Sequence, residues 1–313
     1  MGRWKGRLTM RMIGGVESGG TKTVCVVGTD PETITSRTRI PTTSDPVETL
    51  GEVAEFFAAQ CAAAGPLAAI GIGSFGPCDP NPTSPTYGYV TSTPKPGWTN
   101  TDVSGVLAAQ MRERGIGEVP VVFDTDVNAA ALGEQRFGAG RGVSSLVYLT
   151  VGTGIGGGAM IDGRLAHGLI HPEMGHIRIP RPAQELARFA GVCPFHGDCW
   201  EGVASGPAMA ARWGQSAEDL RPDHPAWDLE AEYIASGLHA LVCVLSPERI
   251  ILGGGVGSVP HLLRRVRPRL VDSLAGYIAS PMITERTLEY VVGPGLGNDS
   301  GVVGALALAQ TAL

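Results

Sequence analysis

The most constraining feature of this chain is glycine that follows short apolar segments. The 313 residues include 45 glycines, and strand-like segments lead directly into Gly19, Gly73, Gly152 and Gly253. Glycine after a strand lets the backbone approach a ligand closely, and its N–H groups can form an anion-binding concavity. A tight hairpin or a strand-to-helix turn would use the same residue. Several such turns together favour a phosphate-binding site.

Three of these turns carry further chemistry. Gly19 and Gly20 precede Thr21 and Lys22, which add a hydroxyl and an ammonium group. The turn Gly152-Thr153-Gly154 adds a second hydroxyl, and Gly253-Gly254-Gly255 offers bare backbone. None is a Walker A loop, and the G-x-G-x-x-G match that begins at Gly152 precedes a strand-like segment where a dinucleotide-binding turn would precede a helix.

Hydrophobic periodicity predicts an α/β protein. Residues 13–16, 23–27 and 33–40 read as a strand meander, after which strands and helices alternate. We expect strands at 68–73, 119–123, 145–151 and 249–252, and helices at 46–64, 103–114, 127–137, 207–212, 227–245, 259–275 and 301–312. This alternation implies mostly parallel central strands, and the length suggests two domains or one large one. No repeat of 20–50 residues is visible.

Composition excludes several classes of protein. A net charge of −6 gives no excess of positive charge with which to bind nucleic acid or a membrane surface. No apolar run approaches the roughly 18 residues of a membrane helix, and the basic first twelve residues lack the apolar core of a signal peptide. We therefore expect a cytoplasmic protein. Cys25, Cys61 and Cys243 lie in apolar or Ala-rich segments and are predicted to be buried thiols.

Asp124-Thr125-Asp126 follows the strand predicted at 119–123 and precedes a helix. Ligands of open α/β sheets bind beyond the carboxyl ends of the strands, so both carboxylates are placed for chemistry. Either could equally cap the helix N-terminus, where Asp is favoured. The residues alone leave both interpretations open.

A metal site is predicted in the least regular part of the chain. His176, Cys193, His196 and Cys199 lie within 24 residues, and two thiolates with two imidazoles suit tetrahedral Zn²⁺. Chance clustering of core residues is the alternative, but the segment has no apolar periodicity. Four protein ligands would close the site, so the zinc would be structural.

Four segments together resemble the ROK family (repressors, open reading frames, kinases), and within it the zinc-containing bacterial fructokinases, also described as mannofructokinases. The resemblance covers nearly everything from Ile13 onward. The segments occur in the family's order and are Glu17-Ser18-Gly19-Gly20-Thr21-Lys22, Thr125-Asp126-Val127-Asn128-Ala129-Ala130-Ala131-Leu132-Gly133-Glu134, Val151-Gly152-Thr153-Gly154-Ile155-Gly156-Gly157 and His171-Pro172-Glu173-Met174-Gly175-His176.

The resemblance implies the actin-like ATPase fold, in which two ribonuclease-H-like α/β domains flank a cleft for ATP and sugar. The small domain would span 12–124 and be completed by the C-terminal helix at about 300–313. The larger domain would span 125–299 and contain a zinc-binding loop at 171–201. ATP, Mg²⁺ and structural Zn²⁺ would be the cofactors, and a homodimer the expected assembly.

The resemblance also implies residue roles. Asp126 would be the catalytic base, and Asp126, Glu173, His176 and Glu201 would contact the sugar. ATP would contact Gly19, Gly20, Thr21, Lys22, Gly152, Thr153, Gly154, Pro207, Gly253 and Gly254. The alternative for Glu201 is a carboxylate in the first turn of a helix. Two departures are Glu17, where much of the family has Asp, and Thr125, where the family often has Asn.

The expected activity is phosphorylation of a free hexose by ATP, D-fructose to fructose 6-phosphate. A kinase for mannose, glucose or an N-acetylated amino sugar is the main alternative. A sugar-responsive repressor of the family would need a helix-turn-helix domain before the first glycine turn, and only about twelve residues precede Ile13. A sugar-binding protein without catalysis conflicts with Asp126 and the glycine turns occurring together.

Overall fold

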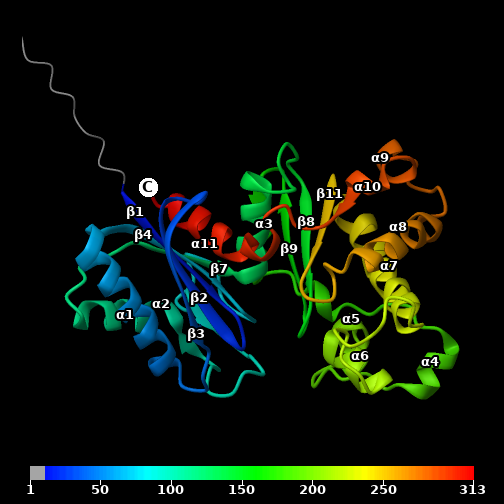
Figure 1. Cartoon of the computed structure of the whole chain (residues 1–313), viewed down its shortest axis with the longest axis horizontal. Helices are drawn as coiled ribbons and strands as arrows, with labels where there is room; N and C mark the ends of the chain where they lie inside the picture. Colours follow the sequence, from blue (N-terminus) through cyan, green and yellow to red (C-terminus); the bar gives the residue numbers. More distant parts are fainter. Residues whose placement is uncertain (1–10) are drawn as a thin grey trace, which may run out of the picture. The chain divides into compact units, whose positions relative to one another are not determined.

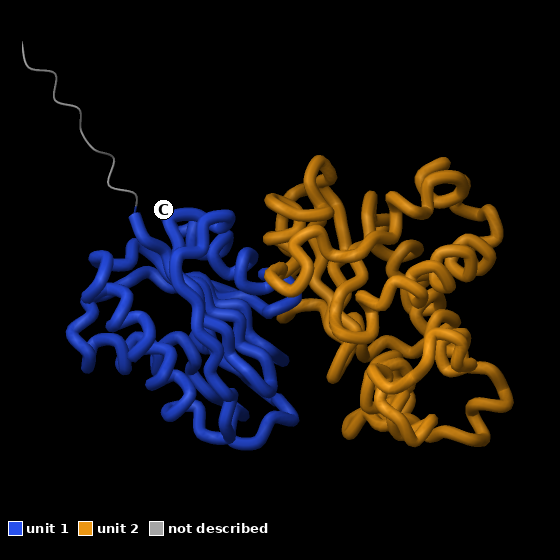
Figure 2. Tube along the Cα trace, in the orientation of Figure 1, with its two compact units in different colours: residues 1–129, 301–313 blue, residues 130–300 orange. Residues whose placement is uncertain are grey.

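The computed structural model describes residues 11–313. It forms two compact units, one of residues up to 129 together with 301–313, the other of residues 130–300 (Figure 2). Among the described residues, none of the helices is long and apolar enough to span a bilayer. Arg3, Lys5 and Arg7, part of the basic start of the chain, lie outside the described residues.

The first unit contains a five-stranded sheet of order β3-β2-β1-β4-β7. Its strands are β1 (Met12–Ser18), β2 (Lys22–Asp30), β3 (Thr33–Pro41), β4 (Leu67–Ser74) and β7 (Val121–Thr125). The first three pair antiparallel, which confirms the predicted meander, whereas β1 pairs parallel with β4 and β4 with β7. The parallel strands therefore end at the same edge, where Ser18, Ser74 and Thr125 lie in register.

Helices cover both faces of this sheet (Figure 1). They are α1 (Pro46–Ala64), α2 (Val103–Glu113) and α11 (Ser300–Gln310). The side chain of Asp45 caps α1, as the Asp-Pro pair predicts, by accepting from the backbone N–H groups of Val47 and Glu48. Phe57 of α1 packs beside Gly14, while Leu306 of α11 packs beside Gly15 on the opposite face.

Gly71→Ala is expected to destabilise the protein by about 1–3 kcal/mol, the usual cost of overpacking a core. A Cβ at Gly71 would lie 1.9 Å from the carbonyl oxygen of Ala305 and 2.7 Å from the backbone nitrogen of Ala309, so α11 would have to move off the sheet. Urea denaturation measures the change. Gly117→Ala is the control, since a Cβ there meets nothing within 4 Å; equal stability of the two variants would contradict the expectation.

The second unit repeats the same pairing pattern in a sheet of order β10-β9-β8-β11-β12. Its strands are β8 (Leu146–Val151), β9 (Ile155–Ile161), β10 (Arg164–Leu165), β11 (Arg249–Gly253) and β12 (Val291–Val292). The first three pair antiparallel and the last two join in parallel. The two units thus share one topology, although no repeat is visible in the sequence.

Four helices of eight or more residues belong wholly or mostly to the second unit. The helices are α3 (Asp126–Phe137), which begins in the first unit, α6 (Gly206–Trp213), α7 (Ala226–Leu245) and α8 (Pro260–Leu274). Side chains of α7 and α8 join the main hydrophobic core of this unit. The prediction of a buried Cys243 is wrong, because this residue of α7 is exposed, while Cys25 is buried and Cys61 is half-buried.

Shorter elements fill the connections. They are β5 (Tyr89–Val90), β6 (Thr101–Asp102), η1 (Met174–His176), α4 (Ala183–Arg188), α5 (Trp200–Ala204), α9 (Pro281–Thr284), α10 (Thr287–Tyr290) and η2 (Gly297–Asp299). The periodicity did not predict most of them, because a segment of two to six residues holds too few positions to show a period.

Candidate active site and metal centre

The first glycine turn connects β1 to β2 in the first unit. The N–H of Gly19 donates to the carbonyl of Lys22 at 2.9 Å. The carbonyls of Gly19 and Thr21 accept from the hydroxyl and the N–H of Thr42, at 2.8 and 3.0 Å. Among residues 11–313, no hydrogen bond engages the N–H groups of Gly20 or Thr21. Gly20 and Thr21 are both exposed, so these donors could bind an anion.

The glycines differ in whether the fold requires them. A Cβ at Gly253 would lie 2.8 Å from the hydroxyl oxygen of Tyr148, and Gly254 has φ +84 with a backbone oxygen at 2.4 Å from its Cβ position. In contrast, a Cβ at Gly20 or Gly255 would meet nothing within 4 Å, and one at Gly152 only an atom at 3.6 Å. Packing therefore explains Gly253 and Gly254, while the open space at the other three is suited to close approach by a ligand.

The glycine loop after β8 is bonded to two helices of its own unit. The N–H of Ile155 donates to Oε2 of Glu201 at 2.9 Å, and a Cβ at Gly154 would lie 2.6 Å from the same oxygen. The N–H of Gly206, which begins α6 just before Pro207, donates to the carbonyl of Gly152 at 2.7 Å. Glu201 is also in the first turn of α5, so part of its role is structural.

The two carboxylates after β7 have different surroundings. Asp124 is buried, and one of its oxygens accepts from the N–H of Thr125 at 2.7 Å and from the amide of Asn128 at 2.8 Å. The hydroxyl of Thr125 accepts from the N–H of Asn128 at 3.0 Å, which caps α3. Asp126 is half-buried at the first position of this helix. Thr125 is therefore the N-cap, and an oxygen of Asp126 accepts from the N–H of the next residue, Val127, at 2.9 Å.

Gly73 brings the start of α3 against β4. A Cβ at this position would lie 3.2 Å from the Cα of Asp126 and 2.8 Å from the Cβ of Ala129. Gly73, near the end of β4, thus determines how closely the start of α3, with Asp126, can pack against the sheet.

The predicted metal ligands come together in the second unit. The side chains of His176, Cys193, His196 and Cys199 each offer an atom, and all four atoms lie within 4.8 Å of one another. The two Nδ1 atoms are 3.3 Å apart, and three Sγ–Nδ1 distances are 3.4, 3.6 and 3.8 Å. Ordinary Zn–N and Zn–S bond lengths in a tetrahedron give about 3.3 Å and about 3.6 Å for such pairs. The four residues therefore fit a zinc ion.

Local structure explains how these ligands converge. Cys193 and Gly197 exchange two backbone hydrogen bonds at 3.1 and 2.9 Å, and Gly197 has φ +67, so the residues between them form a tight hairpin. Cys199 is the N-cap of α5, and the next N–H donates to the carbonyl of Ile177 at 2.9 Å, beside His176. Burial raises the pKa of the Cys199 thiol to about 11, and a bound zinc ion would favour the thiolate, the form that binds metal.

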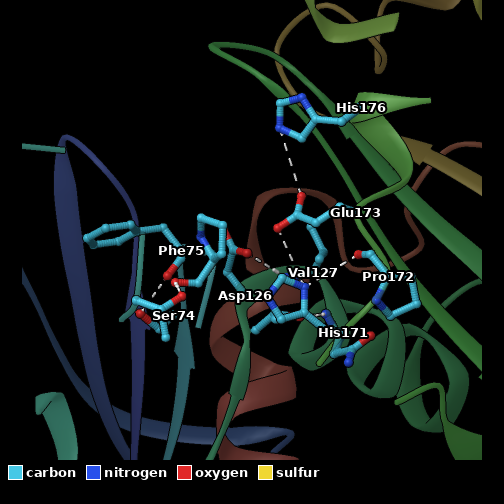
Figure 3. A network of polar contacts seen from close by, with 12 residues as sticks. Ser74, Phe75, Asp126, Val127, His171, Pro172, Glu173 and His176 are labelled. Atoms are coloured by element: carbon cyan, nitrogen blue, oxygen red, sulfur yellow. Dashed lines mark hydrogen bonds and ion pairs between the residues drawn. The ribbon is translucent and has the colours of Figure 1, made fainter. Parts of the chain in front are cut away.

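Glu173 lies on the Nε2 side of the His176 ring, whereas the two sulfur atoms lie on its Nδ1 side. Its Oε2 is 4.0 Å from Nε2 of His176, and its Oε1 is 3.7 Å from Nδ1 of His171, as the dashed lines of Figure 3 show. Burial, with the charge of Glu201 adding to it, raises the pKa of Glu173 to about 7. If His176 binds a metal through Nδ1, a carboxylate on the Nε2 side would help to orient the ring and favour its tautomer.

The sequence of the chain matches known proteins over almost its whole length. The ROK family profile matches residues 13–312. A putative fructokinase of Bacillus subtilis (strain 168) is 45% identical over 302 residues, which are 96% of each chain. The fructokinase of Pediococcus pentosaceus is 40% identical, over 96% of this chain and 99% of its own.

Solved structures agree with these relatives. The ROK hexokinase of Thermus thermophilus is 26% identical with a TM-score of 0.74, over 96% of this chain and 98% of its own. A ROK family glucokinase of Streptomyces griseus, solved with glucose and AMPPNP, is 28% identical with a TM-score of 0.73, over 96% and 99%. These neighbours confirm the expected actin-like ATPase fold. With the family profile matched from residue 13 to residue 312, this chain belongs to the ROK family.

Proposed function

We propose that this chain is an ATP-dependent sugar kinase that converts D-fructose to fructose 6-phosphate. The observation that carries the proposal is the set of fructokinase relatives at 40–45% identity over 87–96% of this chain. The geometry of the first unit supports the chemistry, because the turn at Gly20, which has room for a ligand, and the half-buried carboxylate of Asp126 both follow strand ends of the same sheet.

In the proposed mechanism, a hydroxyl oxygen of the sugar attacks the γ-phosphorus of ATP. Asp126 accepts the hydroxyl proton as the new O–P bond forms and the bond to ADP breaks. The N–H groups of Gly20 and Thr21, the ammonium of Lys22, and the turns at 152–154 and 253–255 would hold phosphates and nucleotide. Pro207 would lie on the nucleotide side. Mg²⁺ would accompany ATP and neutralise phosphate charge.

We propose that the four-residue cluster binds one structural zinc ion. The distances among its ligand atoms support this assignment. The ion would hold loop 171–201 so that Glu173, His176 and Glu201 can accept or donate hydrogen bonds to sugar hydroxyls. Assembly as a homodimer and location in the cytoplasm stay predictions.

ATP-coupled turnover of fructose, mannose, glucose and N-acetylglucosamine by the purified protein tests the proposal. We expect the highest kcat/KM with fructose, measured as ADP release and as the sugar phosphate formed. A preference for mannose would place the chain with the broader hexose kinases. Absence of turnover with all four sugars, for a folded protein loaded with zinc and magnesium, would contradict the proposed function.

A further inference from the structure

A buried threonine lies between two loops of the first unit. Thr42 follows β3 and is 5% exposed. On one side is the glycine turn of residues 19–22, assigned to ATP phosphates. On the other is the long loop of residues 77–98, whose second part, residues 87–98, resembles the fructokinase branch; the resemblance implies that this part forms one wall of the sugar site. All three segments belong to the first unit.

Every hydrogen-bonding group of Thr42 is used. Its N–H donates to the carbonyl of Thr21 at 3.0 Å, and its hydroxyl donates to the carbonyl of Gly19 at 2.8 Å. The same hydroxyl is 3.0 Å from that of Thr23, which in turn is 3.4 Å from that of Ser18. Thr42 thus holds the carbonyls of Gly19 and Thr21. Since the carbonyl and the N–H of one trans peptide point in opposite directions, the N–H of Gly20, which shares a peptide with the Gly19 carbonyl, is directed away from Thr42.

The carbonyl of Thr42 faces the second loop. It accepts a hydrogen bond from the ammonium group of Lys95 at 2.7 Å. Three residues further along, the indole N–H of the fully buried Trp98 donates to the carbonyl of Thr43 at 2.8 Å. Gly97 has φ +80, and a Cβ there would lie 1.8 Å from the carbonyl oxygen of Ser44. The loop is therefore attached to segment 42–44 by close backbone approach and by two side chains.

A second connection runs parallel to the first. Phe75 stacks edge-on against Trp98 with ring centroids 5.2 Å apart, and its N–H donates to the carbonyl of Ser18 at 2.8 Å. Phe75, two residues before the loop, is thus bonded to the end of β1, where the glycine turn begins, and Trp98 at the other end of the loop reaches β1 through Phe75.

We propose that Thr42 is a positioning residue, which holds the phosphate turn in its binding geometry and, through Lys95, couples it to the loop at 77–98. This inference rests on the proposed function. It assigns to Thr42 and Lys95 a role in the response of nucleotide binding to sugar, although neither residue is placed in contact with ATP or with the reacting atoms.

The test uses Thr42→Val, which keeps the shape and removes the hydroxyl, with Thr42→Ser as the matched control that retains it. A second variant, Lys95→Met, removes the ammonium group at a half-buried position. Two quantities are measured: kcat/KM for ATP at saturating fructose, and the Kd of a non-hydrolysable ATP analogue with and without saturating fructose. Thermal melting reports folding of each variant.

We expect Thr42→Val to lower kcat/KM for ATP about 10-fold, the effect of losing one hydrogen bond at a binding turn, and Thr42→Ser to stay within about twofold. Fructose should tighten analogue binding about fivefold or more in the unaltered protein, the usual lower range of coupling between sites. Lys95→Met should bring that ratio close to one. Should Lys95→Met keep the ratio, or Thr42→Val keep kcat/KM for ATP, the inference is overturned.

The outcomes separate this inference from the proposed function. If Thr42 had a purely structural role, Thr42→Val would lower the melting temperature but leave kcat/KM for ATP and the effect of fructose on analogue binding unchanged. That result overturns the inference. If the unaltered protein phosphorylates none of the four sugars, the proposed function fails. Analogue binding still tests the position of the turn in that case, since weaker binding to Thr42→Val than to Thr42→Ser supports the role of the hydroxyl.

Discussion

Asp126→Asn is expected to lower kcat by about 10²-fold or more, within the range that general-base catalysis contributes. The amide cannot accept the proton of the attacking hydroxyl, so the loss arises in the chemical step. Fructose binding should persist, because an asparagine side chain still offers an oxygen and an N–H to a sugar hydroxyl. Coupled ADP release at saturating substrates measures kcat, and calorimetry measures fructose binding.

The structure supports a clean interpretation of this variant. Thr125 already caps α3, and the N–H of Val127 that bonds to Asp126 at 2.9 Å can bond equally to an asparagine oxygen. Asp102→Asn is the matched control, because Asp102 caps α2 through the N–H of Gly105 at 2.7 Å and asparagine caps as well as aspartate. Turnover of Asp126→Asn close to that of the control would remove Asp126 as the base.

Removing the metal is expected to have the second large effect. Exhaustive chelation should release one zinc ion per chain, lower the melting temperature and raise the KM for fructose by about 10-fold or more, in line with the effect of disturbing the shell of a metal site. The physical reason is that Cys193 is the one buried side chain of hairpin 193–197, while Phe195 is 63% exposed, so packing alone does little to hold the hairpin. Metal analysis, differential scanning calorimetry and fructose kinetics measure the three quantities.

A matched pair of cysteine variants sharpens this experiment. Cys199→Ser removes a buried ligand and should reproduce the effects of chelation, whereas Cys243→Ser replaces an exposed thiol of the same unit and should change none of them. A zinc-free protein that keeps both its melting temperature and its KM for fructose would show that the cluster is not a structural metal site.

Much of the fold is predictable from the sequence, because apolar segments, helix caps and glycine turns are each encoded by a few neighbouring residues. The meander of β1 to β3, the capped helix α1 and the strand β8 follow from short apolar segments and from the Asp-Pro and glycine signals. The four metal ligands are predictable for a similar reason. Two of them lie three residues either side of His196, a spacing that a tight turn brings together.

The prediction of a buried Cys243 was wrong for a reason that is also physical. Its neighbours in the chain are apolar, but the exposure of a helical residue depends on which face of α7 packs against the sheet, and position 243 is on the outer face. Apolar neighbours in the sequence indicate only that one face of the helix is buried. The orientation of the helix decides which residue is exposed.

The order of strands and helices, the glycine turns and the four residues of the candidate metal site can be read from the sequence alone, since each depends on residues close together in the chain. Three other features emerge only from the folded structure: the two sheets share one topology, packing requires Gly253 and Gly254 but not Gly20 or Gly255, and Thr42 joins two loops. These facts depend on contacts between residues such as Lys95 and Thr42, 53 positions apart. Such contacts form only when the sheet brings distant segments together, and local patterns carry no record of them.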